Sequence, residues 1–184
     1  MQQPLANTSR SANDAVRILG LDPGLRHTGW GLIESKGQGL RYIASGVINP
    51  SVKEESLALR LAELFEKLKD VVKTCAADEA VVEEVFVNKN PGSTLKLGMA
   101  RGVVLLVPAH LEVPVFEYTA NQVKKSVVGA GHADKNQVMF VVRRLLPTAP
   151  VDMKPDAADA LAAALCHAHH RLMNSYSSIL TQSA

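Results

Sequence analysis

Acidic residues stand at three places in this sequence where an apolar or neutral side chain would be easier to bury. Asp22 ends the apolar segment ILGLD, and Glu83 and Glu84 interrupt the apolar run AVVEEVFV. Asp156 and Asp159 fall in the first turn of a predicted helix, where their spacing puts both on one face. An unpaired buried carboxylate carries a desolvation penalty of several kcal/mol. Each of these carboxylates therefore needs a partner that offsets the penalty.

Each acidic residue also has an ordinary structural explanation. Asp22 precedes Pro23 and Gly24, and an aspartate often accepts hydrogen bonds from the backbone of such a turn. Of the two adjacent glutamates, one must point away from the face of the other, and alternation alone does not tell which. Asp156 and Asp159 would complement the dipole of a helix that begins there. The case for chemistry therefore depends on the acidic residues taken together.

Carboxylates that converge favour a hard divalent cation. In α/β folds, functional sites gather at the carboxyl ends of strands, and a helix can begin against that edge. Three or four carboxylates there would repel one another strongly unless cations were bound between them. Oxygen ligands select Mg²⁺ or Mn²⁺ rather than zinc. Two such ions ~3.5 to 4 Å apart are the arrangement for two-metal phosphoryl transfer, which is the chemistry we predict.

The hydrophobic pattern predicts the elements that would hold these acids at one edge. Strands are expected over 17–22, 28–34, 40–48, 80–87 and 113–118, and helices over 56–75, 94–111, 120–128, 134–146 and 155–172. The first three strands form an antiparallel meander, and the later strands extend it in parallel through helical crossovers. The predicted fold is therefore α/β, a mixed five-stranded sheet flanked by helices.

Length and composition predict a single soluble domain. The chain has 184 residues, 47% of them hydrophobic and 21% charged, which is enough for one core and too little for two. We expect a disordered N-terminal arm over 1–16, one folded domain over 17–173 and a flexible C-terminal tail over 174–184. Neither a secretory signal nor an apolar run of membrane length is found, so we expect a cytoplasmic protein that does not contact the membrane.

Charge and sulfur chemistry narrow the function further. The segment 87–144 is rich in cations, although the whole chain has a net charge of only +2. A basic face beside an acidic pocket suits a nucleic-acid enzyme, and solvated charge scattered over helices explains the same pattern. Cys75 and Cys166 lack metal-ligand spacing and are expected to be small buried hydrophobic residues. His167, His169 and His170 could form a ligand cluster, but cations near a helix C-terminus are ordinary.

Long motifs of this sequence resemble one known family in order and spacing. They are LGLDPGLRHTGWG, VVEEVFVNKN, LKLGMARG, PVFEYTANQVKKSVVGAGHADKNQV and KPDAADALAAAL. Over 17–172 the chain closely resembles the RuvC family of Holliday-junction resolvases. The resemblance implies a ribonuclease H-like fold and a homodimeric endonuclease that cuts four-way junction DNA. It also implies Mg²⁺ as cofactor, two ions per site with Mn²⁺ as a possible substitute, and the RuvAB branch-migration complex as partner.

The resemblance also implies which residues act. By position, the catalytic and metal-binding acids of the family fall on Asp22, Glu83, Asp156 and Asp159, which selects Glu83 over Glu84. The implied reaction is in-line attack of a metal-activated hydroxide on the scissile phosphodiester. It leaves 5′-phosphate and 3′-hydroxyl ends, and a symmetric dimer would make paired nicks in recombination and DNA repair.

Five further residues match DNA-contacting positions of the family. Phe86 matches an aromatic residue that approaches unstacked bases near the junction centre. The matched basic residues are Lys89, Lys124, Lys135 and Arg101. Without the resemblance, Phe86 would be read as a core residue of a buried strand and the lysines as solvated surface charge.

Three competing functions remain at this point. Asp-x-Gly followed by Thr-Gly-x-Gly also resembles the phosphate loop of actin-like ATPases and sugar kinases, but this chain has no room for their second lobe. A non-catalytic junction-binding protein would use the acids only for structure. Another nuclease of the same fold could act on a different branched or hybrid substrate.

Overall fold

One mixed sheet forms the centre of the molecule. The computed structural model describes residues 14–51, 56–84, 90–129, 131 and 133–182. The sheet has five strands in the order β3-β2-β1-β4-β5, with β1 to β3 antiparallel and β4 and β5 parallel to β1. The strands are β1 (Val16–Asp22), β2 (Thr28–Lys36), β3 (Gly39–Ile48), β4 (Glu79–Glu84) and β5 (Val115–Thr119). The predicted α/β fold with a mixed five-stranded sheet is confirmed.

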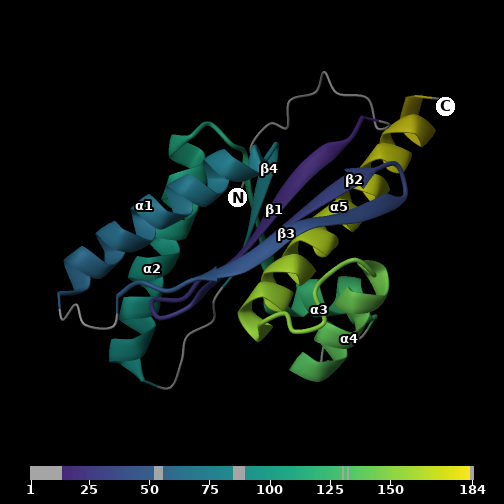
Figure 1. The fold of residues 1–184 in the computed structure, drawn as a ribbon. Helices are drawn as coiled ribbons and strands as arrows, with labels where there is room; N and C mark the ends of the chain where they lie inside the picture. The colour runs from purple at the N-terminus through teal and green to yellow at the C-terminus, as the bar shows by residue number, and fades with distance from the viewer. Residues whose placement is uncertain (1–13, 52–55, 85–89, 130, 132, 183–184) are drawn as a thin grey trace.

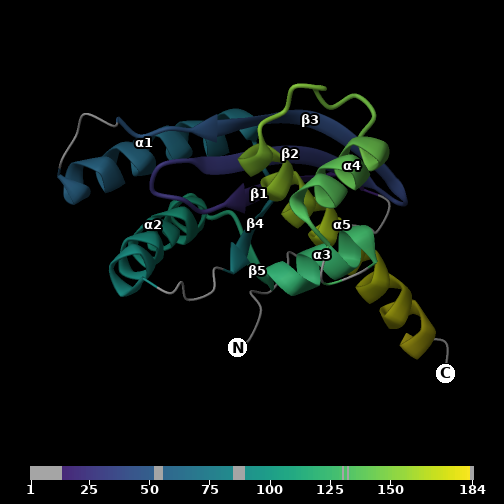
Figure 2. The same ribbon diagram turned by 90° about the horizontal axis from the view of Figure 1, so that it is seen from below.

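Helices cover both faces of this sheet (Figure 1). On one face lie α1 (Leu57–Cys75) and α2 (Pro91–His110), and on the other lie α3 (Ala120–Val128), α4 (Lys135–Leu145) and α5 (Pro155–Gln182). The view from below shows the same two layers, with α5 running along the sheet (Figure 2). Alternate strand residues therefore face either α5 or the pair α1 and α2, and this alternation decides where each acidic side chain points.

The backbone of α5 touches the sheet because glycines stand in the strands beneath it. A Cβ atom added to Gly20 would lie 1.9 Å from the carbonyl oxygen of Ala160, and one added to Gly29 would lie 1.9 Å from that of Asp156. Gly29 pairs with Asp22 across β1 and β2. These contacts bring the first turn of α5 against the end of β1, where the sequence predicts the acidic site.

Helix starts follow the capping signals of the sequence. The hydroxyl of Ser56 caps α1 by accepting a hydrogen bond from the backbone of Leu59. At α2, the side chain of Asn90 accepts hydrogen bonds from the backbone of Gly92 and Ser93, and Pro91 occupies the first turn. Because of this cap, α2 begins earlier than the expected residue 94.

Several expected boundaries are corrected by the structure. The expected arm over 1–16 overlaps β1, which already includes Val16, and residues 1–13 lie outside the described residues. The helix α5 continues to Gln182, past the end at residue 172 and into the expected flexible tail. Neither glycine nor proline interrupts RLMNSYSSILTQ, so nothing in the local chemistry ends the helix there. Among the described residues, no helix combines the length and apolar character needed to cross a membrane.

Candidate active site

Strand alternation points Asp22 and Glu83 toward the same face of the sheet. In β1, Ile18 belongs to the core beneath α5, so Asp22, four residues later, faces α5 as well. In β4, Val81 belongs to that same core, and Glu83 shares its face. Val82 packs instead in the core beneath α1 and α2, so Glu84 points to that side. The choice of Glu83 over Glu84 is therefore consistent with the sheet geometry.

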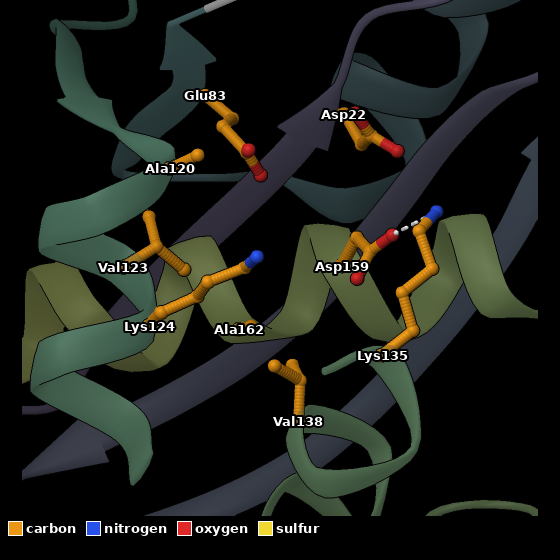
Figure 3. A pocket seen from close by; sticks show the side chains of 9 residues that line it. All are labelled: Asp22, Glu83, Ala120, Val123, Lys124, Lys135, Val138, Asp159 and Ala162. Carbon is orange, nitrogen blue, oxygen red and sulfur yellow. Dashed lines mark hydrogen bonds and ion pairs between the residues drawn. The ribbon is translucent and has the colours of Figure 1, made fainter. Parts of the chain in front are cut away.

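Two neighbouring cavities meet at Asp22. The first has a volume of about 200 Å³, and three of its lining residues are the acids Asp22, Glu83 and Asp159. Figure 3 shows Asp22 and Glu83 at the strand ends reaching toward Asp159 on α5. The second cavity, of about 610 Å³, is lined by both Asp22 and Asp156. The four acids are thus brought together around Asp22 from β1, β4 and α5, which lie far apart in the sequence.

The electrostatics of these acids show negative charge that nearby cations do not balance. Burial, followed by the charges of Glu83, Asp159 and Asp156, raises the pKa of Asp22 to about 8. Burial and then the charge of Asp159 raise the pKa of Glu83 to about 7. Without a cation, both carboxyls therefore hold protons near neutral pH. Such strongly perturbed groups in a cavity are typical of functional sites.

Two lysines stand at the rim of the acidic cavity. The ammonium nitrogen of Lys135 lies 3.3 Å from Asp159 Oδ2, while 75% of its side chain stays exposed (Figure 3). Lys124 projects from α3 into the same cavity, and its charge lowers the pKa of Glu83 without cancelling the effect of burial. Both lysines, which the family resemblance matches to DNA-contacting positions, therefore lie beside the acids.

The donor set fits hard divalent cations. The four acids offer only carboxylate oxygens as ligands. The raised pKa values of Asp22 and Glu83 mean that these two carboxyls carry protons, which a bound cation can replace. As placed, no three acidic, histidine or cysteine side chains among the described residues converge closely enough to hold one ion. A bound cation attracts ionised carboxylates, so we expect these side chains to move inward on binding. We predict this movement to be local, because β1, β4 and α5 already hold the acids at one edge.

The other DNA-contacting positions have different outcomes. Phe86 and Lys89 lie outside the described residues. Arg101 forms an ion pair with Glu117, and Glu117 pairs in register with Val82, on the face covered by α1 and α2. Arg101 therefore lies on the opposite side of the sheet from the acids and lines neither cavity. The DNA contact of Arg101 stays a prediction of the family resemblance, and its guanidinium pairs with Glu117 in the absence of DNA.

The histidines near the end of α5 do not form a ligand cluster. The buried ring of His167 lies 2.7 Å from Glu79 Oε2 through Nε2 and 2.9 Å from the hydroxyl of Tyr118 through Nδ1. Arg171 pairs with the other oxygen of Glu79. His169 lies 3.1 Å from the hydroxyl of Ser126, and the ring of His170 stacks on Tyr118; Cys75 and Cys166 are buried and free, as expected.

This buried network positions the strand that carries Glu83. It ties the start of β4, through Glu79, to α5, through His167 and Arg171. Sequence reasoning missed Glu79. The signal that could have found it is the pair of basic side chains one turn apart on an alanine-rich, otherwise apolar helix, because such a pair needs an acidic partner inside.

The raised pKa values predict how the stability of the metal-free protein depends on pH. Below about pH 4, Asp22 is protonated in the folded and unfolded states alike. Between that pH and about 8, only the folded state keeps the proton, so the free energy of unfolding falls as the pH rises. Replacing Asp22 by Asn removes this loss. In EDTA, the variant should gain at least ~2 kcal/mol, or about 4 to 8 °C, over the wild type by about pH 8.5.

Thermal melts of both proteins from about pH 5.5 to about pH 8.5 measure this difference. The control is Asp152→Asn, because Asp152 is exposed and lines neither cavity. A constant difference between Asp22→Asn and the wild type across this range would contradict the raised pKa.

Comparisons with known proteins identify the family of this chain. The family model for crossover junction endodeoxyribonuclease RuvC matches residues 18–167. A crossover junction endodeoxyribonuclease RuvC of Mesorhizobium japonicum is 52% identical over 163 residues, which cover 89% of this chain and 95% of that protein. One of Paramagnetospirillum magneticum is 57% identical over 156 residues, which cover 85% of this chain and 93% of that protein.

Solved structures extend the likeness to the fold. The RuvC of T. thermophilus, solved in complex with a Holliday junction substrate, is 32% identical, with a TM-score of 0.79 over 86% of this chain and 96% of that one. The yeast mitochondrial Holliday junction resolvase, at 14% identity and a TM-score of 0.63, shares the fold over 92% of this chain and 86% of its own. This chain, with its acids gathered at one sheet edge, belongs to the RuvC family of crossover junction endodeoxyribonucleases.

Proposed function

We propose that this protein resolves four-way DNA junctions by metal-dependent hydrolysis, with Asp22, Glu83, Asp156 and Asp159 as its catalytic, metal-binding acids. The observation that carries this proposal is the assembly of these acids around Asp22, where burial and neighbouring carboxylates raise the pKa values of Asp22 and Glu83 despite the two lysines at the rim. Membership of a family named for crossover junction cleavage supplies the substrate. The actin-like and kinase alternative falls with the family assignment.

The acids of the site would hold the metal ions that hydrolysis requires. When bound, two Mg²⁺ ions, or Mn²⁺ in their place, supply activation of the attacking water and stabilisation of charge on the leaving oxygen. Asp22 lines the cavity of Glu83 and Asp159 and also that of Asp156, so its carboxylate would hold the ions together with these three acids. Water attacks the phosphorus in line as the bond to the 3′ oxygen breaks. The products are a 5′-phosphate and a 3′-hydroxyl, ends that a ligase can seal.

Metal-dependent nicking of a synthetic four-way junction tests the proposal. The protein should nick two strands symmetrically in Mg²⁺ and leave the linear duplex and the RNA–DNA hybrid intact. Resolved product ends should carry 5′-phosphate. Cleavage of duplex or hybrid instead of the junction would favour another nuclease of this fold, and binding without cleavage in any divalent metal would favour a non-catalytic junction-binding protein.

Lys124 is proposed to contact DNA together with Lys135, Phe86 and Lys89. Lys124 lines the acidic cavity, and a phosphate at the site would lie next to its ammonium group. Replacing Lys124 by Ala should weaken junction binding and reduce the slope of log affinity against log salt by about 1, because one fewer phosphate charge is neutralised.

Titration of a labelled junction at several salt concentrations measures the effect of Lys124→Ala. The matched control is Lys125→Ala, since Lys125 is the next residue of α3 but is exposed and lines neither cavity. An unchanged salt slope in Lys124→Ala, or an equal change in both variants, would show that Lys124 does not contact phosphate.

A homodimer is also part of the proposal. Along α2, the exposed side chains Leu95, Met99 and Leu106 are 63%, 40% and 56% accessible, and their spacing puts them on one helix face. A second copy that packs its own α2 on this face would bury the stripe by an isologous contact. Such a dimer carries two equal active sites, as a two-fold symmetric junction requires for paired nicks.

Replacing Leu106 by Glu should shift the protein from dimer to monomer, because two buried carboxylates would face each other near the two-fold axis. Analytical ultracentrifugation measures the change. Leu59→Glu is a matched control, since Leu59 has the same 56% exposure on α1. A Leu106→Glu variant that stays dimeric, or a monomeric wild type, would contradict this interface.

A partner complex and a compartment are also proposed. A junction resolvase of this family acts with the RuvAB branch-migration complex, which we propose as the partner of this chain. The cytoplasm, where such a complex would meet chromosomal DNA, is the proposed compartment.

A further inference from the structure

We infer that Arg26, Arg60 and Lys96 form a second phosphate-binding site, which holds the DNA strand on the side of Asp22 away from Lys124 and Lys135. This inference rests on the proposed function and adds a strand path to it. Its physical basis is the second cavity, whose volume of about 610 Å³ lies within the ~300 to 1,000 Å³ range of ligand sites.

Three separate parts of the chain supply cations to this cavity. The turn between β1 and β2 contributes Arg26 and His27, the first turn of α1 contributes Arg60, and the first two turns of α2 contribute Lys96. The remaining lining residues are Asp22, Pro23, Gly24, Leu25, Ser93, Leu97 and Asp156. The fold, and no local sequence pattern, therefore brings these cations together.

The cations of this cavity are available to a ligand. Arg26 and Lys96 are exposed, and neither has an ion-pair partner among the residues that the structure describes. Arg60 donates a hydrogen bond from Nη2 to the carbonyl oxygen of Leu25 at 3.1 Å, which holds its guanidinium at the cavity wall. Its Nε is buried and has no hydrogen-bond partner among the described residues. An anion is the ligand that these unmatched donors fit.

The position of Asp22 identifies the anion as part of the substrate. Asp22 lines the cavity of Lys124 and Lys135 and also the cavity of Arg26 and Lys96. A DNA strand is a row of regularly spaced phosphates. With the scissile phosphate at Asp22, the next phosphate on one side would lie toward Lys124 and Lys135. The next phosphate on the other side would lie toward Arg26 and Lys96. The strand would therefore cross the edge of the sheet from α3 and α4 to the β1–β2 turn and α2.

The double variant Arg26→Ala/Lys96→Ala tests this site. The control Lys36→Ala/Lys73→Ala removes the same charge from exposed residues that line neither cavity. Junction binding in EDTA and single-turnover cleavage in Mg²⁺ are measured for both. The test variant should bind about 5- to 10-fold more weakly, with a salt slope lower by about 1.5, and at sub-saturating protein its cleavage should fall by the same factor as its binding.

Neutral methylphosphonates placed on either side of the scissile phosphate locate the contact. At the phosphate that faces Arg26 and Lys96, the substitution should weaken binding by the wild type. It should have little further effect on the double variant, because that variant already lacks these cations. On the other side, the loss should be the same for both proteins. Additive losses on both sides, or a test variant equal to the control in affinity and salt slope, would overturn the inference. A wild type that binds the junction but never nicks it would contradict the proposed function and leave this binding test intact.

Discussion

Replacing Asp22 by Asn should abolish junction cleavage, with a loss of about 10³-fold or more in the single-turnover rate. Asn has nearly the same shape as Asp but no negative charge, so it is a poor ligand for a hard cation. Asp22 lines the cavity of Glu83 and Asp159 and also that of Asp156, so its replacement removes the proposed ligand that adjoins the other three acids. Junction affinity in EDTA should stay within about twofold, because the cations that meet phosphate remain and the metal-free Asp22 carboxyl already holds a proton near neutral pH.

Glu84→Gln is the matched control for Asp22→Asn. Glu84 is also a carboxylate at this edge of the sheet, but alternation turns it toward α1 and α2. Its variant should cleave at the wild-type rate. Near-wild-type cleavage by Asp22→Asn, or an equal loss in Glu84→Gln, would show that the acids do not divide between the faces as described. Loss of junction binding by folded Asp22→Asn would also contradict the assignment.

Replacing Gly29 by Ala should separate the first turn of α5 from the sheet. A Cβ atom at this position would lie 1.9 Å from the backbone oxygen of Asp156, a contact that no rotamer change can relieve. Overpacking of this kind costs about 1 to 3 kcal/mol of stability. Displacement of a catalytic group by ~1 Å can reduce the rate about 100-fold, so cleavage should fall by at least that factor.

Gly39→Ala is the control for this glycine. Gly39 is an exposed strand residue at the far end of β2 and β3, and its added Cβ would lie 3.3 Å from the carbonyl oxygen of Lys36. Melting temperature and single-turnover cleavage are measured for both variants. If Gly29→Ala folds and cleaves like Gly39→Ala, the close approach of α5 does not position Asp156.

Much of the fold could be predicted from the sequence because its signals are local. The spacing of Leu64, Leu68 and Val72 shows a helix with one buried face, and Ser56 marks where that helix begins. The end of α5 could not be predicted, since serines and an asparagine weaken a helix without terminating it. For this reason α5 continues past residue 172, where the apolar pattern that predicts the helix ends.

The acidic site could be predicted only in part from the residues themselves. Val81 and Val82 are both fully buried, so the pattern of β4 does not say which of the following glutamates faces α5. The family resemblance selected Glu83, and the layers on either side of the sheet supply a physical reason. The ion pair between Arg101 and Glu117 could not be predicted either, because Glu117 belongs to a strand that the motif around Arg101 does not contain.

The cluster of cations around the second cavity could not be predicted from the sequence, because it depends on contacts between distant elements. Arg26, Arg60 and Lys96 belong to a turn and two helices that are distant along the chain. Nothing in their local patterns distinguishes them from solvated surface charge. Only the packing of α1 and α2 beside the β1–β2 turn places them around one hollow.

The order of the acids along the chain bears on how the protein is synthesised. Asp22 and Glu83 lie in the first half, whereas Asp156 and Asp159 belong to the last helix, which packs across β1 and β2. A polypeptide still on the ribosome, or one released too early, has strands but lacks half of its carboxylates. With the proposed catalytic acids, we therefore expect catalytic competence to arrive last and prematurely terminated products that lack α5 to be unable to nick DNA.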